Sequence, residues 1–138
     1  MDRLVLDTNS LIQSLPVKSQ YHDLWISLFD GRNILCVSNE ILEEYEEVIQ
    51  RNISGILAAR VISAILTNEY TSLITPYFHF NLIQSDDDDN KFVDCAVCGS
   101  AKFIVTEDHH FNILRNISFP KVDICSLDDM MKILRSGE

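Results

Sequence analysis

The amino-acid sequence predicts an α/β fold in which a parallel sheet of about five strands carries helices on both faces. Short apolar runs alternate along the chain with longer segments whose apolar residues recur at helical spacing. Acidic and polar turn residues follow two of the apolar runs, at Asp7 and at Asp108, which places both aspartates where strands end. No repeat or low-complexity linker interrupts the 138 residues, so we expect one domain over residues 1–138.

The five predicted strands are short apolar runs separated by helical segments. They are Arg3–Leu6, Ile34–Val37, Ser72–Thr75, Ala101–Val105 and Val122–Cys125. The predicted helices cover Ser19–Phe29, Asn39–Arg51, Ser54–Leu66, about Asp89–Gly99, and Leu127–Leu134. Ser38 or Asn39 and Ser126 are suitable caps, and Gly31 is a good terminator. Residues 77–85 show neither pattern and should be irregular, with no role assigned to His79.

Composition and charge narrow the class of protein. Hydrophobic residues make up 46% and charged residues 23% of the chain, which is a globular balance. No apolar run approaches the roughly 18 residues of a membrane span. The first residues enter a strand directly, without a signal-peptide pattern, so we expect a cytoplasmic protein with no membrane partner. The net charge of -10 argues against a broad basic surface for nucleic acid, but metal ions held by carboxylates attract phosphate.

Four cysteines raise the alternative of a zinc or redox site. Cys95 and Cys98 form a C-x-x-C pair inside a helical segment, whereas Cys36 and Cys125 stand singly in apolar runs. Because no second close pair is present, packing as small buried hydrophobic residues is the favoured interpretation.

Acidic residues gather where the sheet is predicted to end. Parallel strands place their carboxyl ends along one edge, so Asp7 and Asp108 should share that edge. Asp89 begins a helix, and Glu44 borders the apolar stripe of another, from which its carboxylate can reach the same edge. Clustered carboxylates repel one another unless they are neutralised, and oxygen ligands suit magnesium or manganese. The sequence therefore predicts a metal site able to hydrolyse phosphodiester bonds without a covalent nucleophile.

Each of these acids also has a simpler interpretation. Asp7 is as well explained by a helix N-cap as by catalysis. The run Asp86–Asp89 is, by itself, typical of a solvated acidic loop. The glutamates around Glu44, including the reserve candidate Glu40, are typical of a solvated helix face.

Four short motifs together resemble the PIN-domain ribonucleases. They are Asp7-Thr8-Asn9, S-x-E-I-L-E-E at residues 38–44, D-D-N-K-F at residues 88–92, and T-x-D at residues 106–108. Each motif is short, but their order and spacing are specific, and the resemblance extends from residue 3 to about residue 134. It is nearest to the bacterial branch classed as toxin components of toxin–antitoxin systems.

The resemblance implies a three-layer α/β/α sandwich and an acidic metal site. The implied quartet, which would be both catalytic and metal-binding, is Asp7, Glu44, Asp89 and Asp108, with Mg²⁺ or Mn²⁺ as cofactor. Residues expected to orient the site or substrate are Thr8, Asn9, Asp87, Asp94 and Thr106. Asp88 stands where the branch usually has proline, so the register among Asp86–Asp89 stays open. A homodimer and an antitoxin partner are implied in the same way.

The leading hypothesis is a metal-dependent endoribonuclease that acts on RNA as the toxin of a toxin–antitoxin pair. Asp7, Asp89 and Asp108 would hold metal, while Glu44 would ligate it or orient the attacking water. An alternative is a catalytically silent PIN fold that binds RNA or protein, although all four family acids are present. A phosphatase of the haloacid-dehalogenase type ranks lower, since it needs an aspartate where this chain has Asn9.

Few basic residues are expected near the site. The candidates are Lys18, Lys91, Lys102 and Arg115. RNA binding by one chain should therefore be weak and salt-sensitive. Tighter RNA binding would require a dimer or a partner protein.

Overall fold

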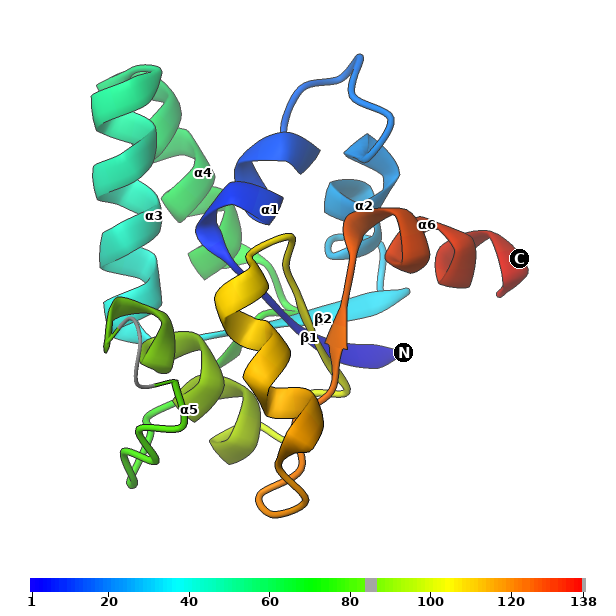
Figure 1. The fold of residues 1–138 in the computed structure, drawn as a ribbon. Coiled ribbons are helices and arrows are strands. Elements are labelled where there is room, and N and C mark those ends of the chain that lie inside the picture. Colours follow the sequence, from blue (N-terminus) through cyan, green and yellow to red (C-terminus); the bar gives the residue numbers. More distant parts are fainter. Residues whose placement is uncertain (84–86, 138) are drawn as a thin grey trace.

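A five-stranded parallel sheet forms the centre of the structure, a computed structural model that describes residues 1–83 and 87–137 (Figure 1). Its strands are β1 (Asp2–Leu6), β2 (Asn33–Val37), β3 (Ser72–Leu73), β4 (Phe103–Val105) and β5 (Ile124–Cys125). The order across the sheet is β3-β2-β1-β4-β5, and every pairing is parallel. The predicted α/β class, with a parallel sheet of five strands, is confirmed.

Helices cover both faces of this sheet. They are α1 (Thr8–Ser14), α2 (His22–Ser27), α3 (Asn39–Asn52), α4 (Gly55–Thr67), α5 (Asn90–Cys98) and α6 (Leu127–Ser136), with 3₁₀ turns η1 (Asp87–Asp89) and η2 (His109–Asn116). In Figure 1, α1 to α4 and α6 lie above the strands, whereas α5 and η2 lie below them. This arrangement is the expected three-layer α/β/α sandwich. No helix in residues 1–83 or 87–137 is long and apolar enough to cross a membrane.

Strand β1 is the central strand of the sheet, with two strands on each side of it. Leu4, Val5 and Leu6 are fully buried because both faces of the strand are covered, as is usual in parallel sheets. Leu6 is paired with Val105 of β4, so the two strands end level with each other. The residues that follow them, including Asp7, therefore leave the sheet at the same edge.

Local side chains set where several helices begin. Ser38, Ser54 and Ser126 cap α3, α4 and α6, and each accepts a hydrogen bond from the backbone N–H three residues later. The helix predicted from residue 19 begins later, at His22. The Ser19 hydroxyl donates to the carbonyl of Gln13 and accepts from the N–H of Tyr21, and this turn replaces the first helical turn.

Other differences from the predicted elements concern the lengths of strands and two short helical segments. Strands β3 and β5 span two residues each rather than four, and each has a single neighbouring strand. Helix α1 and the 3₁₀ segment η2 were not predicted as elements with defined ends; both are short and follow directly on a capping aspartate.

Candidate metal centre

Asp7 and Asp108 are connected through Thr106 at the carboxyl edge of the sheet. The backbone N–H of Asp7 donates to the carbonyl of Val105 at 3.1 Å, which continues the β1–β4 pairing by one residue. The Thr106 hydroxyl donates to Oδ2 of Asp7 and accepts from the N–H of Asp108 at 3.0 Å. One buried hydroxyl thereby orients two of the predicted site residues.

Asp7 combines the two roles that the sequence left open. Its Oδ1 atom accepts from the N–H of Ser10 at 2.8 Å, so the side chain caps α1. Its other oxygen is held by Thr106 and turned toward the sheet edge. Burial raises the pKa of Asp7 and the nearby charge of Asp108 adds to this, while the hydrogen bonds from Thr106 and Ser10 oppose it. A cation bound nearby would favour the ionised carboxylate.

Among the residues that the structure describes, Asp89, Asp108 and His110 form a group of side chains that could hold a metal ion. One ligand atom from each lies within 4.8 Å of the other two. The Nδ1 atom of His110 is 3.1 Å from Oδ1 of Asp108 and 3.8 Å from Oδ2 of Asp89. Asp108 caps η2 by accepting from the His110 N–H at 2.9 Å, and this tight turn brings the imidazole beside the carboxylate.

Glu44, on α3, is held by two donors of the chain itself. The ammonium of Lys91, in the first turn of α5, is 2.7 Å from Oε1 of Glu44. The hydroxyl of Thr8, the residue after Asp7, donates to Oε2. Glu44 therefore has both carboxylate oxygens engaged, one of them by a positive charge.

The remaining predicted residues have different surroundings. Asn9 is exposed and lines a hollow of about 310 Å³ together with Asp7 and Asp108. Asp94 is buried in α5, where it accepts from the N–H of Phe80 at 3.0 Å and lies 3.2 Å from Nδ1 of His79. The structure thus gives His79 a partner and turns Asp94 toward the segment before α5. Asp86 and the side chain of Asp87 lie outside the described residues.

Two groups in the site were missed by sequence reasoning, in different ways. His110 was given no role, although it follows Asp108 by two residues in the polar turn after a predicted strand, and that spacing was an available signal. Lys91 was counted only as a nearby base; its contact with Glu44, 47 residues away, leaves no local signal. Lys102 was placed near the site wrongly, because its ammonium lies 3.7 Å from Asp2, at the amino edge of the sheet.

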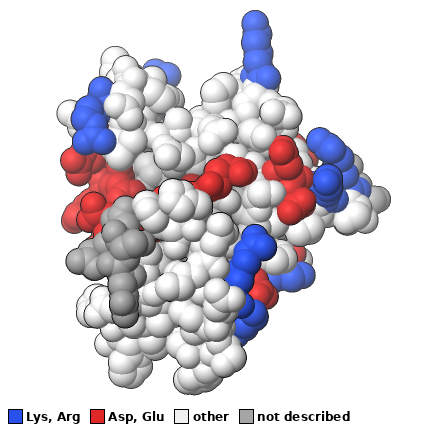
Figure 2. Space-filling view, in the orientation of Figure 1, with Lys and Arg blue, Asp and Glu red and all other residues white. Residues whose placement is uncertain are grey.

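Carboxylates dominate the surface around this edge. An acidic groove of about 360 Å³ is lined by Glu40, Glu43, Glu44, Glu47, Val48, Arg51, Asp88 and Lys91. Figure 2 shows acidic side chains in a band between the upper helices and the lower layer. The oxygen-rich donor set, completed by one imidazole, fits a hard or borderline divalent ion such as Mg²⁺ or Mn²⁺.

The cysteines have the surroundings of core residues. Cys36, Cys95 and Cys125 are buried, and all four cysteines are free thiols. Burial raises the pKa of Cys95 to about 12 and that of Cys125 to about 11, so both thiols stay protonated at neutral pH. Metal binding and disulfide exchange both need the thiolate, so the interpretation as packing residues is favoured over zinc or redox chemistry.

Solved structures with the same fold include several toxin–antitoxin proteins. The structure of VapBC2 from Rickettsia felis, bound to a DNA fragment from its promoter, matches with a TM-score of 0.62 at 12% identity, over 90% of this chain and 98% of that one. DNA-bound VapBC from Salmonella typhimurium gives 0.62 at 16% identity, over 92% and 99%. VapC20 from Mycobacterium tuberculosis, a toxin that cleaves the sarcin–ricin loop, gives 0.54 at 14% identity, over 79% and 92%.

Sequence comparison identifies the family more directly than these structures, whose low identities show the fold alone. No curated protein sequence matches the chain. The family model described as the PIN domain matches residues 3–110, and this range includes Asp7, Glu44, Asp89, Asp108 and His110. Because that match covers well over half of the sequence, the chain belongs to the PIN-domain family.

Proposed function

We propose that this protein is a divalent-metal-dependent endoribonuclease. The observation that carries the proposal is the placement of Asp89, Asp108 and His110, with ligand atoms within 4.8 Å of one another, beside Asp7 at the carboxyl edge of the sheet. Ligands bind at this edge in open parallel sheets. The donor types favour Mg²⁺ or Mn²⁺, and membership of the PIN-domain family supports a nuclease.

Different residues of the protein would bind the cation and orient the attacking water during hydrolysis. Asp89, Asp108 and His110 would hold the cation, and Asp7, fixed by Thr106 and Ser10, would complete its surroundings. Glu44, fixed by Thr8 and Lys91, would orient the attacking water. When bound, a divalent cation lowers the pKa of its water and offsets the charge that develops on phosphate.

The likeness to toxin structures supports a narrower proposal for the biological role. The VapBC structures from Rickettsia felis and Salmonella typhimurium contain a toxin with its antitoxin, and VapC20 is a toxin that cleaves the sarcin–ricin loop. We therefore propose RNA as the substrate and an antitoxin as the partner of this chain. We also propose a homodimer, and light scattering of the purified chain tests this directly, since a strict monomer would contradict it.

An RNA cleavage assay tests the enzymatic proposal. A mixed-sequence RNA labelled at one end should be cut internally with Mg²⁺ or Mn²⁺ and left intact in EDTA, with activity restored by excess metal. Asp108→Asn should abolish cleavage, whereas Asp123→Asn, an exposed aspartate on the loop before β5, should not. Full activity in EDTA would exclude the metal mechanism. RNA binding without cleavage under any metal would instead identify the silent binding module.

A further inference from the structure

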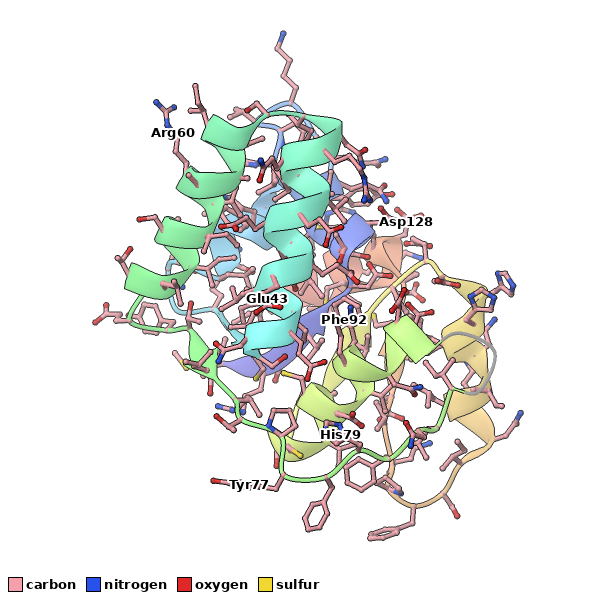
Figure 3. All side chains as sticks on the ribbon, turned by 90° about the vertical axis from the view of Figure 1, so that its left-hand side faces the viewer. Glu43, Arg60, Tyr77, His79, Phe92 and Asp128 are labelled. Atoms are coloured by element: carbon pink, nitrogen blue, oxygen red, sulfur yellow. The ribbon has the colours of Figure 1, made fainter. Side chains whose placement is uncertain are left out.

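Lys91 and Glu44 form an ion pair inside the acidic groove. Their side chains are only 16% and 23% exposed, and the ammonium lies 2.7 Å from the carboxylate. Figure 3 looks onto α3 and α5, the two helices that carry the pair. The Coulomb attraction in such a contact is stronger than that of an ion pair in open solvent, because water screens it poorly.

The groove around this pair is rich in negative charge. Five of its lining residues are acidic: Glu40, Glu43, Glu44, Glu47 and Asp88. The other cation in the lining, Arg51, is 62% exposed and lies 3.5 Å from Glu47, which is exposed as well. Arg51 therefore pairs with Glu47 and not with Glu44. Lys91 is consequently the cation that neutralises Glu44.

Nucleases with two metal ions hold the ions about 4 Å apart between bridging carboxylates. In this chain the acidic residues separate into two groups. Asp89, Asp108 and His110 converge on one another, whereas Glu44 is already bonded by Lys91 and Thr8. A second divalent ion at Glu44 would have to displace an ammonium that is largely buried and hydrogen-bonded.

We propose that Lys91 is the built-in counter-cation of Glu44, so that the site takes one divalent ion, at Asp89, Asp108 and His110, instead of two. Lys91 is then a positioning residue that acts through Glu44 and fixes the number of metal ions. The inference rests on the proposed metal-dependent function, but it concerns metal stoichiometry and is measured without turnover.

The experiment counts Mn²⁺ ions bound per full-length chain by calorimetric titration, with electron paramagnetic resonance of free Mn²⁺ as a second measure. The wild-type chain and Lys91→Arg, which keeps the charge, should each bind one ion. Lys91→Met removes the ammonium but keeps an unbranched side chain, and it should bind two. The second ion should be lost in Lys91→Met/Glu44→Gln, because its main carboxylate is then neutral. Circular dichroism checks that each variant is folded.

Several outcomes would overturn the inference. If the wild-type chain binds two ions and Glu44→Gln binds one, Glu44 is a ligand and the inference fails while the proposed nuclease stands. If Lys91→Met folds and still binds one ion, Lys91 does not set the stoichiometry. If Lys91→Met does not fold, the Mn²⁺ affinity of Glu44→Gln is compared with that of wild type. A change of less than about threefold supports the inference. A tenfold loss, about 1.4 kcal/mol, overturns it. No binding by the wild-type chain would overturn the metal-dependent function as well.

Discussion

The hydroxyl of Thr106 donates a hydrogen bond to Oδ2 of Asp7, which lies 99 positions earlier in the chain. The same oxygen of Thr106 accepts from the N–H of Asp108. Thr106 is buried at the end of β4 and Asp7 at the end of β1, so this contact joins two neighbouring strands just beyond their last paired residues. It determines how two acidic groups are presented at the sheet edge.

Replacing Thr106 by valine should therefore destabilise the protein and disturb the site. Valine has nearly the same shape but can neither donate to Asp7 nor accept from the N–H of Asp108. The loss of a hydrogen-bond donor to a buried carboxylate should lower the free energy of unfolding by about 1–3 kcal/mol. Urea denaturation measures this change. Thr106→Ser keeps the hydroxyl and should stay within about 1 kcal/mol of wild type. Equal stability of the two variants would contradict this role.

The raised pKa of Asp7 predicts a dependence of stability on pH in the metal-free protein. Burial, the largest cause, raises the pKa of this carboxyl in the folded state above that of the unfolded chain. The resulting stabilisation is fully present below the unfolded pKa and is lost as the pH rises through the folded pKa. Asp7→Asn does not titrate and keeps a capping side chain, so at pH 7 it should be at least as stable as wild type.

Urea denaturation in EDTA at pH 7 and near pH 4 measures this effect. The unfolding free energy of wild type, relative to Asp7→Asn, should increase at the lower pH. Asp123→Asn, at an exposed position, should show a much smaller change. A relative decrease for wild type would mean that the pKa of Asp7 is lowered, contrary to its buried position. RNA cleavage that survives in Asp7→Asn would show that this carboxylate is not needed for catalysis.

Asp94 offers a test of a structural role against a metal-binding one. Its two oxygens contact Phe80 N–H and His79 Nδ1, and they hold the segment before α5 against that helix. Asp94→Ala should cost about 1–3 kcal/mol of unfolding free energy and speed amide exchange in residues 79–83. His79→Gln, which changes only a 67% exposed partner, should have a smaller effect. A tenfold loss of Mn²⁺ affinity in Asp94→Ala would instead support the metal-binding role.

RNA binding by the chain should be weak and strongly dependent on salt. Phosphate contacts rest on lysine and arginine, and this chain has a net charge of -10 with Lys91 already engaged by Glu44. Fluorescence anisotropy with Asp108→Asn, which should bind without cutting, measures the affinity at two salt concentrations. Nanomolar binding that does not change with salt would contradict this expectation.

The features that the sequence predicted correctly are those encoded by local pattern. Apolar runs alternating with helical segments were enough for a parallel sheet with helices on both faces, and they placed Asp7 and Asp108 directly after strands. Serine caps at positions 38 and 126 could be recognised because a capping side chain and the backbone N–H that donates to it lie three residues apart. Each of these inferences uses residues within one helical turn or one strand.

The partners of the site side chains were decided by the tertiary structure alone. Glu44 and Lys91 are 47 residues apart, and only the packing of α3 against α5 brings the ammonium to the carboxylate. The turn of Asp94 toward His79 likewise needs the path of the irregular segment before α5. Periodicity shows which face of a helix is buried, but it contains no information about which distant side chain meets that face. The acidic residues could thus be identified from the sequence, whereas which of them are free to bind a cation depends on long-range packing.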